Sequence, residues 1–376
     1  MSEVRVYTKP FVLTSLAYLC FFTNVSAYNL LPLYLQALGA LTGEIGTIMA
    51  MYSGAAILGQ AVTGRLLDRG WRKACLVAAA GLLTAVSAAF GATTHLGWVL
   101  YFLRFLQGLG FAVYMTSSLT LIADLAPPAR RAEAVGIYGT GGLVAVALGP
   151  ALGEGILQVW GFPAFFSATV LMAAATLALA AAVPAPPTTP AVHGPRLGWA
   201  SWAPFLPVLL PAFQYGLANT IVFVFLPPFA RLLGLPRVGP FYIAYTGAAI
   251  LVRFLGGGLA DRLGREQVIL PALGAMTAGI LLCSGLQATW LLVAIGVLNG
   301  TAQGFVMPAE NALAFERAPS GRRGQAMAFY NGANLVGATL GASGFGWLVQ
   351  ALGYRPAFVL ASGVLSLGTW AFWRQG

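Results

Sequence analysis

Twelve apolar stretches dominate this chain, and each is long enough to cross the hydrocarbon core of a bilayer as a helix. They begin near residues 11, 43, 74, 97, 132, 162, 203, 238, 267, 289, 324 and 354, and a spanning helix needs about 20 mostly apolar residues. Only 8% of the residues are charged, whereas a soluble domain carries about 25%. The first stretch is followed by no A-x-A-like cleavage site, so we interpret it as the first span. The sequence therefore predicts an all-α integral membrane protein with twelve transmembrane helices.

Lys and Arg are divided very unequally between the two sets of predicted loops. Of the 20 basic residues, fifteen fall on the side that holds both termini, and only Arg231, Arg237 and Arg355 fall on the opposite side. Cytoplasmic loops of membrane proteins are rich in Lys and Arg, so we expect both termini in the cytoplasm. The excess of Arg over Lys, with much Ala and Gly, favours a bacterial protein of the cytoplasmic (inner) membrane.

The chain offers little for soluble-type enzyme chemistry. Cys20, Cys75 and Cys283 are far apart in apolar stretches, and the only histidines, His95 and His193, lie in short polar breaks. A metal pair or a catalytic triad needs such residues in groups. We therefore expect no metal, no cofactor and no enzyme activity, although a polytopic membrane enzyme remains the alternative from another class. The net charge of +10 comes from dispersed loop residues, so no nucleic acid is expected as a partner.

The second half of the sequence repeats the first. At an offset of 193 residues, GAAILGQAVTGRLLDR from Gly54 aligns with GAAILVRFLGGGLADR from Gly247. At 192, DLAPPARR from Asp124 aligns with ERAPSGRR from Glu316. We therefore predict two pseudo-symmetric six-helix bundles, residues 1–183 and 202–376, joined by a Pro-rich cytoplasmic linker at 184–201. In transporters built from parallel repeats, the solute site lies near the midplane between the halves.

A loop motif occurs once in each half. GGLADRLGRE, residues 257–266, fits the pattern G-x-L-A-D-R-x-G-R, and GRLLDRGWRK, residues 64–73, keeps its Gly, Asp and two Arg with Trp71 in place of a Gly. The motif resembles that of the major facilitator superfamily, and the resemblance covers essentially the whole chain. It implies the fold of that family and a cytoplasmic gating latch, in which we expect Gly64 to allow close helix approach. The latch residues are Gly64, Asp68, Arg69, Arg72, Lys73, Gly258, Asp261, Arg262 and Arg265.

The fourth predicted span holds a second family motif, R-x-x-Q-G-x-G, through Arg104, Gln107, Gly108 and Gly110. An Arg inside a span is costly and usually faces the bundle interior or water. Arg104 is therefore the strongest single candidate for a functional side chain.

The fifth span resembles the family's antiporter motif. It keeps Gly149, Pro150 and Gly153, whereas the second half has Ala342 at the position of the Pro. This one-sided kink is typical of family members that export a substrate in exchange for protons.

Proton exchange needs a buried acid, and most of the ten acidic residues lie in loops or at helix ends. Glu154 and Glu310 remain. Glu310 lies inside the tenth span, and Arg253 lies at similar depth in the eighth and is its candidate partner. We predict proton coupling through Glu310, Arg104, Arg253 and Glu154. The first span has no carboxylate, unlike many exporters of the family.

In this family, spans 1, 4, 7 and 10 line the substrate cavity, and spans 5 and 11 contribute at the interface. The candidate cavity residues are Asn24, Tyr28, Gln107, Tyr114, Gln214, Asn219, Asn311, Tyr330 and Asn334. We interpret the chain as a monomeric, proton-coupled exporter of small organic or amphipathic molecules that works by alternating access in the lipid bilayer. The alternative is a symporter or uniporter for a small organic anion or sugar, favoured by the two arginines inside spans.

Overall fold

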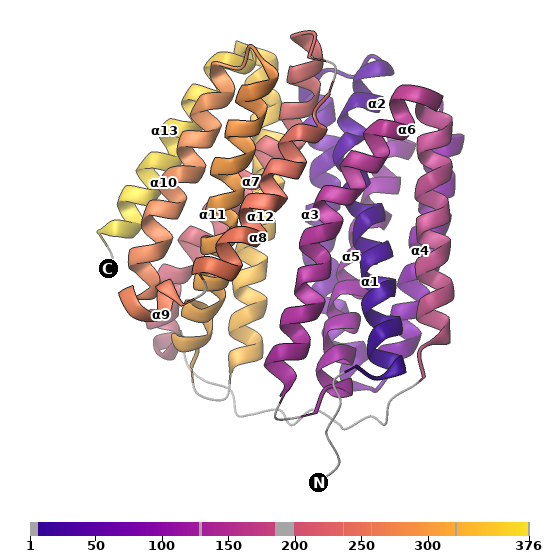
Figure 1. Ribbon diagram of the computed structural model, residues 1–376, viewed down its shortest axis with the longest axis vertical. Coiled ribbons are helices and arrows are strands. Elements are labelled where there is room, and N and C mark those ends of the chain that lie inside the picture. The colour runs from indigo at the N-terminus through magenta and orange to yellow at the C-terminus, as the bar shows by residue number, and fades with distance from the viewer. Residues whose placement is uncertain are drawn as a thin grey trace. The chain divides into compact units, whose positions relative to one another are not determined.

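A computed structural model of the chain describes residues 7–127, 130–184, 199–235, 237–256, 258–319 and 322–374. Among these residues every regular element is a helix (Figure 1). The first part contains α1 (Lys9–Ala27), a 3-10 turn (Tyr28–Leu30), α2 (Leu31–Ala37), α3 (Thr42–Asp68), α4 (Arg72–Ala92), α5 (Trp98–Leu125) and α6 (Arg131–Ala182). A second 3-10 turn (Trp199–Phe205) leads into α7 (Leu206–Leu232), α8 (Gly239–Gly256), α9 (Leu259–Leu263), α10 (Arg265–Ser284), α11 (Thr289–Glu316), α12 (Arg323–Leu352) and α13 (Tyr354–Trp373).

Ten helical segments of the described chain are long and apolar enough to cross a membrane. One of them, Glu133–Ala182, contains two of the predicted spans. They are separated only by Gly161, where the backbone leaves helical geometry with φ at 75°. Glycine has no Cβ and adopts positive φ without strain. The region of the predicted eighth span forms α8 and the short α9, and it is not among the ten. The prediction of an all-helical membrane protein is confirmed, and the count of twelve spans stays a prediction.

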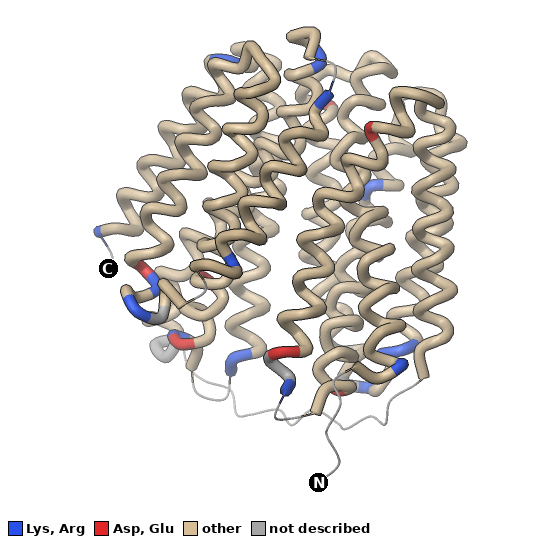
Figure 2. The backbone as a smooth tube through the Cα atoms, in the orientation of Figure 1, with Lys and Arg blue, Asp and Glu red and all other residues tan. Residues whose placement is uncertain are grey.

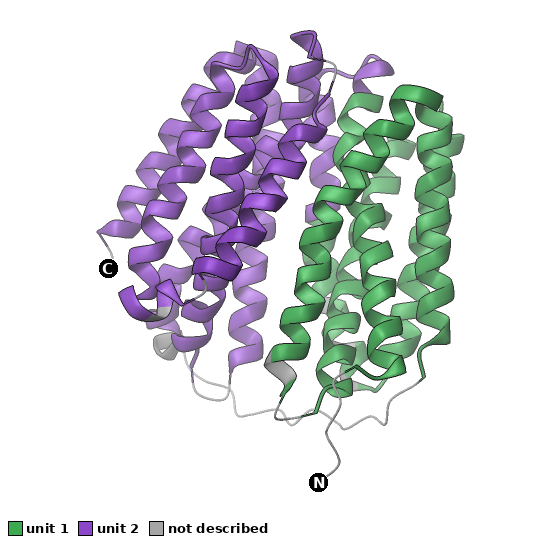
Figure 3. Ribbon diagram, viewed as in Figure 1, with its two compact units in different colours: residues 1–34, 54–192 green, residues 35–53, 193–376 purple. Residues whose placement is uncertain are grey.

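The chain forms two compact units (Figure 3). Unit 1 comprises residues 1–34 and 54–192, and unit 2 comprises residues 35–53 and 193–376. Helix α3 therefore contributes its beginning to unit 2 and its end to unit 1.

Unit 1 is built on the packing of α6 against α1 and α4, and of α4 against α5. Its core is apolar and aromatic, with Phe11, Phe21, Leu83 and Tyr114 buried together. The rings of Phe21 and Tyr114 stack at 3.8 Å between centroids, and those of Tyr18 and Tyr138 at 4.0 Å. Stacked aromatic rings fix the orientation of α1 against α5 and α6, because such pairs have preferred geometries.

Unit 2 repeats these pairings with its own helices. Helix α12 packs on α7, α10 on α11, and α10 on α13, which correspond to α6 on α1, α4 on α5, and α4 on α6. Small residues bring α8 close to α11: a Cβ on Gly296 would lie 2.6 Å from the Phe241 carbonyl oxygen, and one on Gly304 2.8 Å from Val252 Cβ. The recurrence of the same pairings is the structural counterpart of the repeated sequence.

Charged residues concentrate at the helix ends, with few inside the helices (Figure 2). In unit 1, the ends of α4 and α5 meet through an ion pair between Arg72 and Asp124. Most of the long apolar helices thus carry their charges where a spanning helix meets water, as the thickness of the hydrocarbon core requires.

Candidate functional site

The carboxyl group of Glu310 lies completely buried in α11, with an exposed fraction of 0%. Tyr330 of α12 donates a hydrogen bond from its hydroxyl to Glu310 Oε2 at 3.1 Å. The other oxygen, Oε1, has no hydrogen-bond partner among the described residues. A buried carboxyl with an unfilled acceptor is poorly suited to remain permanently ionised, because burying a charge is costly unless the charge is paired.

Gln303 shares a helical face with Glu310, and polar side chains of α7 and α8 form hydrogen bonds with it or beside it. Gln303, Met307 and Glu310 follow one another at the spacing that places side chains on one face of a helix. Gln303 accepts a hydrogen bond from the Tyr215 hydroxyl of α7, and Tyr245 of α8 donates to Asn219 Oδ1 at 3.1 Å.

Arg253, in the last turn of α8, points its guanidinium at Met307 Sδ at 3.5 Å. The arginine therefore reaches the helical face that carries Glu310. We refer to these residues together as the Glu310 cluster: Tyr215, Asn219, Tyr245, Arg253, Gln303, Glu310 and Tyr330.

Arg104 lies in a separate polar cluster inside unit 1. It is 5% exposed, and its Nη1 donates to Gln107 Oε1 at 2.6 Å, one turn further along α5. The sequence motif thus places an arginine and its acceptor on one helical face. The buried position agrees with the expectation that an Arg inside a span turns away from lipid.

Asn24 and Tyr28 of unit 1 connect three helices within that unit. Asn24 Nδ2 donates to the Thr169 carbonyl oxygen at 2.6 Å and to Ser87 Oγ at 3.3 Å, and the Tyr28 hydroxyl lies 3.3 Å from Thr169 Oγ1. Both side chains are buried. In this structure they hold α1, α4 and α6 together, so a role in contacting substrate stays a prediction.

Four other predicted cavity residues have different surroundings. Tyr114 is buried under Phe21, and Gln214 Nε2 donates to the Leu365 carbonyl oxygen at 2.8 Å, which joins α7 to α13. Asn311 donates to the Met307 carbonyl oxygen of its own helix at 2.8 Å, and Asn334 is half-buried where α12 approaches Gly216 of α7. Of the predicted cavity residues, the structure brings Asn219 and Tyr330 into the cluster of Glu310.

The second acid predicted for proton coupling, Glu154, lies in α6 of unit 1 and is 8% exposed. It belongs to a different unit from the Glu310 cluster. The two acids are therefore separate candidates.

The latch residues lie at the helix ends of both units. Arg72 pairs with Asp124, and Arg265 pairs with Glu316 at 3.1 Å. Unit 2 adds a reversed pair between Glu266 and Arg317. The corresponding positions of the repeat thus form ion pairs between adjacent helices in each unit.

The remaining latch residues are less constrained. Gly258 is the N-cap of α9, Arg69 and Arg262 are exposed, and Lys73 is half-buried. The side chains of Asp68 and Asp261 lie outside the described part of the chain. A Cβ on Gly64 would meet no described atom within 4 Å, so the close helix approach that we expected at Gly64 is not present among the described residues.

The glycines of the antiporter motif lie at close contacts within unit 1. A Cβ on Gly149 would lie 2.6 Å from the Thr23 carbonyl oxygen, and one on Gly153 would lie 2.9 Å from the Phe165 ring. Pro150 lies between them inside α6. The motif therefore allows α6 to pack directly on the backbone of α1.

Sequence reasoning missed Tyr215, Tyr245 and Gln303, although one signal was present. Gln303 precedes Glu310 by seven residues, or two helical turns, so the two side chains share a face. Ser87 and Thr169, the partners of Asn24, carry no comparable signal, because small hydroxyl residues are common in membrane helices.

Comparison with known proteins places these features in a family. Residues 13–257 and 238–375 match the sequence profile of the Major Facilitator Superfamily. The multidrug resistance protein MdtG of Serratia proteamaculans is 32% identical over 164 residues, which is 42% of this chain and 39% of that protein. MdtG of Escherichia coli O81 is 30% identical over 187 residues, 48% of this chain and 45% of that protein. The chain thus spans less than half the length of the curated relatives that it matches.

Two crystal structures of transporters share the fold at low sequence identity. A bacterial homologue of the human lysosomal transporter Spinster has a TM-score of 0.75 and 16% identity, covering 99% of this chain and 96% of that one. The nucleoside transporter NupG has a TM-score of 0.74 and 16% identity, covering 98% and 99%.

Proposed function

The chain belongs to the major facilitator superfamily, and from that premise we propose that it exports small organic, amphipathic molecules in exchange for protons. It is a multi-pass membrane transporter and not an enzyme. Export is supported by the relatives named as multidrug resistance proteins and by the antiporter motif at Gly149, Pro150 and Gly153. The whole proposal rests most heavily on one observation, the completely buried carboxyl group of Glu310.

We propose that Glu310 binds and releases the exchanged proton. The cost of an ionised carboxyl depends strongly on its access to water. A conformational change that opens or closes access to Glu310 therefore changes its preference for a proton. Tyr330 can donate a hydrogen bond to the carboxyl group, and the positive charge of Arg253 lies on the same helical face. Export then follows if substrate binding and proton binding favour different conformations.

The rest of the Glu310 cluster is proposed to connect this acid to the site of the substrate. Tyr215 and Gln303 are buried, whereas Asn219 is only half-buried and accepts from Tyr245. The hydrogen-bonded pairs of Tyr215 with Gln303 and of Tyr245 with Asn219 offer polar groups to water or substrate. Arg104 is proposed to act in the first half, where it keeps a positive charge inside α5. Glu154 is the second candidate acid.

Alternating access between two six-helix bundles is the proposed mechanism. The halves are residues 1–183 and 202–376, with twelve spans, both termini in the cytoplasm and the bacterial inner membrane as the location. The recurring helix pairings and the paired charges at equivalent positions in each unit support this arrangement.

The test uses purified protein in liposomes whose interior is more acidic than the medium. Lipophilic cations, neutral amphipathic compounds, sugars, nucleosides and carboxylates are added in turn, while an entrapped dye follows the internal pH. Antiport predicts that an amphipathic compound accumulates inside while the interior becomes less acidic, and that an ionophore collapsing the pH gradient abolishes accumulation. Accumulation without any pH change would overturn proton coupling.

A second candidate, symport or uniport of a small organic anion, is favoured by the buried guanidinium of Arg104 and by Arg253 in the Glu310 cluster. The same liposomes distinguish the two functions, because symport of a carboxylate moves proton and substrate in the same direction. Carboxylate uptake accompanied by proton uptake would replace the export proposal.

A further inference from the structure

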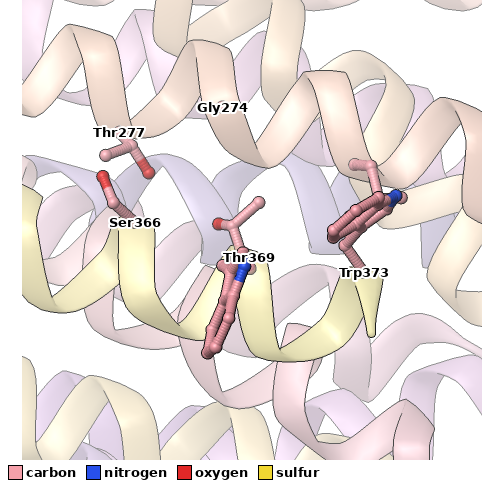
Figure 4. Close-up of a pocket in the computed structure, with 7 residues that line it drawn as sticks. Gly274, Thr277, Ser366, Thr369 and Trp373 are labelled. Atoms are coloured by element: carbon pink, nitrogen blue, oxygen red, sulfur yellow. The ribbon is translucent and has the colours of Figure 1, made fainter. Parts of the chain in front are cut away.

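A groove lies between α10 and α13 of unit 2, outside the polar clusters described above. It has a volume of about 410 Å³ and is lined by Leu270, Gly274, Thr277, Ser366, Thr369, Trp370 and Trp373. Figure 4 shows Thr277 and Ser366 pointing toward each other from the two helices. The groove exists because the lining side chains at its centre are small, and because a Cβ on Gly274 would meet no described atom within 4 Å.

The inner wall of this groove suits an apolar occupant. Its three hydroxyl groups are already bound to the backbone of their own helices: Thr277 to the Leu273 carbonyl oxygen, Ser366 to that of Ser362, and Thr369 to that of Leu365, each at 2.9 Å. The hydroxyl hydrogens are thus used, and the remaining lining is aliphatic, aromatic or glycine. From Leu270 to Thr277 the groove runs for seven residues, about 10 Å along the helix.

One end of the groove has a different chemistry. Trp370 and Trp373 are 49% and 62% exposed there, and the guanidinium of Arg374 lies over the Trp370 ring at 4.0 Å. Tryptophan concentrates where the hydrocarbon core of a bilayer meets the headgroups. Arg374 thereby stands at the level at which a lipid phosphate would lie.

Two acidic groups near this end, among the residues that the structure describes, are each engaged by an arginine. At the beginning of α10, Glu266 pairs with Arg317, and Arg265 pairs with Glu316. The positive charge of Arg374 is therefore not opposed by an unpaired acid among these residues. The groove is thus apolar over about 10 Å of its length and ends at two tryptophans and an arginine. A lipid matches both parts, with an acyl chain for the apolar part and a headgroup for the arginine.

We propose that the groove between α10 and α13 binds a phospholipid with an anionic headgroup, whose acyl chain lies along Gly274 and Thr277 and whose phosphate contacts Arg374. The lipid belongs to the leaflet on the side where α10 begins and α13 ends. The attraction between one arginine and anionic lipid strengthens binding about fivefold. The site therefore binds anionic phospholipids more tightly than zwitterionic ones.

The test reads tryptophan fluorescence in nanodiscs of phosphatidylcholine that contain increasing fractions of phosphatidylglycerol brominated on one acyl chain. Bromine quenches tryptophan on contact, so Trp370 and Trp373 report an occupied groove. We expect a saturable phase of quenching at low fractions of the brominated anionic lipid. Brominated phosphatidylcholine in its place should give that phase only at about fivefold higher fractions. The double variant Trp370→Phe/Trp373→Phe identifies the signal of the groove.

Four further variants decide between occupants. Gly274→Leu fills the groove and should remove the saturable phase, and Thr277→Leu serves the same purpose if the first variant folds poorly. Gly363→Leu is the matched control, because Gly363 is exposed on α13, a Cβ there meets no described atom within 4 Å, and it is not part of the groove. Arg374→Gln should keep quenching but lower the preference for the anionic lipid about fivefold.

Equal, non-saturating quenching by both lipids would overturn the proposal, as would a saturable phase that survives Gly274→Leu and Thr277→Leu. A phase that depends on the number of protein copies in each nanodisc would show that a second copy of the chain occupies the groove instead, and would also overturn it.

Discussion

Single glycines decide how closely helices pack in this protein. Gly149 of α6 is a clear case, because an added Cβ would lie 2.6 Å from the Thr23 carbonyl oxygen and 2.7 Å from the Ala27 nitrogen. Both neighbours are backbone atoms of α1, so they cannot move as a flexible side chain can. In contrast, a Cβ on Gly155 of the same helix would meet no described atom within 4 Å.

We predict that Gly149→Ala lowers the stability of the protein, because α6 must move away from α1 to admit the methyl group. Overpacking of this kind costs about 1–3 kcal/mol. Thermal unfolding in detergent measures the effect, with Gly155→Ala as the matched control. If both variants melt at the wild-type temperature, the contact between α1 and α6 is looser than described.

For single residues, the sequence predicts which charged side chains are buried better than it predicts which residues they contact. Arg104 and Glu310 were singled out because a charge inside a span is costly, and both are buried. For Asn24 and Tyr28 the sequence does not indicate their hydrogen-bond partner Thr169, and their predicted role in the substrate cavity stays a prediction. Spanning helices are apolar toward lipid as well as toward protein, so hydrophobic periodicity does not reveal which face is inside.

Adjacent helices are tied at their ends by ion pairs that repeat between the units. The pair of Arg72 with Asp124 joins α4 to α5, and two pairs join α10 to α11. In unit 2, each helix contributes one arginine and one glutamate that are adjacent in sequence. The arginine of each helix pairs with the glutamate of the other. The repeated sequence predicts that Asp124 and Glu316 occupy equivalent positions. It does not identify their arginine partners, which lie on another helix and are seen only in the three-dimensional structure.

We predict that Arg317→Glu destabilises the contact between α10 and α11, because it places a second carboxylate beside Glu266. The double variant Glu266→Arg/Arg317→Glu should restore most of the loss, since it reverses the pair. Partly exposed pairs contribute about 0.2–1 kcal/mol, so the expected changes in melting temperature are small and need a complete double-mutant cycle. Additive effects of the two substitutions would show that the pair contributes nothing.

The extents of the helices follow from the lengths of the apolar stretches. The stretch expected near residue 97 begins at Trp98, and the one expected near 289 begins at Thr289. The exceptions have local causes. Two predicted spans follow each other without a loop, because the chain turns at Gly161 alone. The region after Gly256 forms the separate short helix α9 before Gly264, where φ is 102°. Glycines with positive φ turn the chain without a long loop, which a pattern of hydrophobicity alone does not show.

For the whole molecule, the sequence alone indicated the family, because the family's motifs place charged residues and glycines at fixed spacings. The repeated helix pairings agree with the internal duplication. The orientation in the membrane rests on the uneven division of Lys and Arg, and it leads to a prediction that depends on no side-chain contact.

We predict that loops after α4 and α10 face the outside of the cell, and that loops after α3 and α11 face the cytoplasm. Single cysteines at Thr94, Gln287, Arg69 and Ala318 test this in a background in which Cys20, Cys75 and Cys283 are replaced. A membrane-impermeant maleimide added to intact cells should label Thr94→Cys and Gln287→Cys only. Labelling of Arg69→Cys and Ala318→Cys in place of the other two would reverse the orientation.

The central claim is that Glu310 couples the movement of a solute to the movement of protons. It is tested most directly by comparing Glu310→Gln with wild type in liposomes, using a substrate found in the screen described above. The control is Glu44→Gln, which keeps a side-chain acceptor for the Leu41 backbone N–H at the beginning of α3. The measurement is the change in internal pH caused by substrate, together with exchange of labelled for unlabelled substrate in the absence of a pH gradient.

We predict that Glu310→Gln still exchanges substrate but no longer moves protons, whereas Glu44→Gln behaves as wild type in both assays. Gln keeps the size and an acceptor for Tyr330, and it cannot carry the proton. Proton movement that persists in Glu310→Gln at the wild-type ratio to substrate would contradict the account, and would assign the coupling to another group.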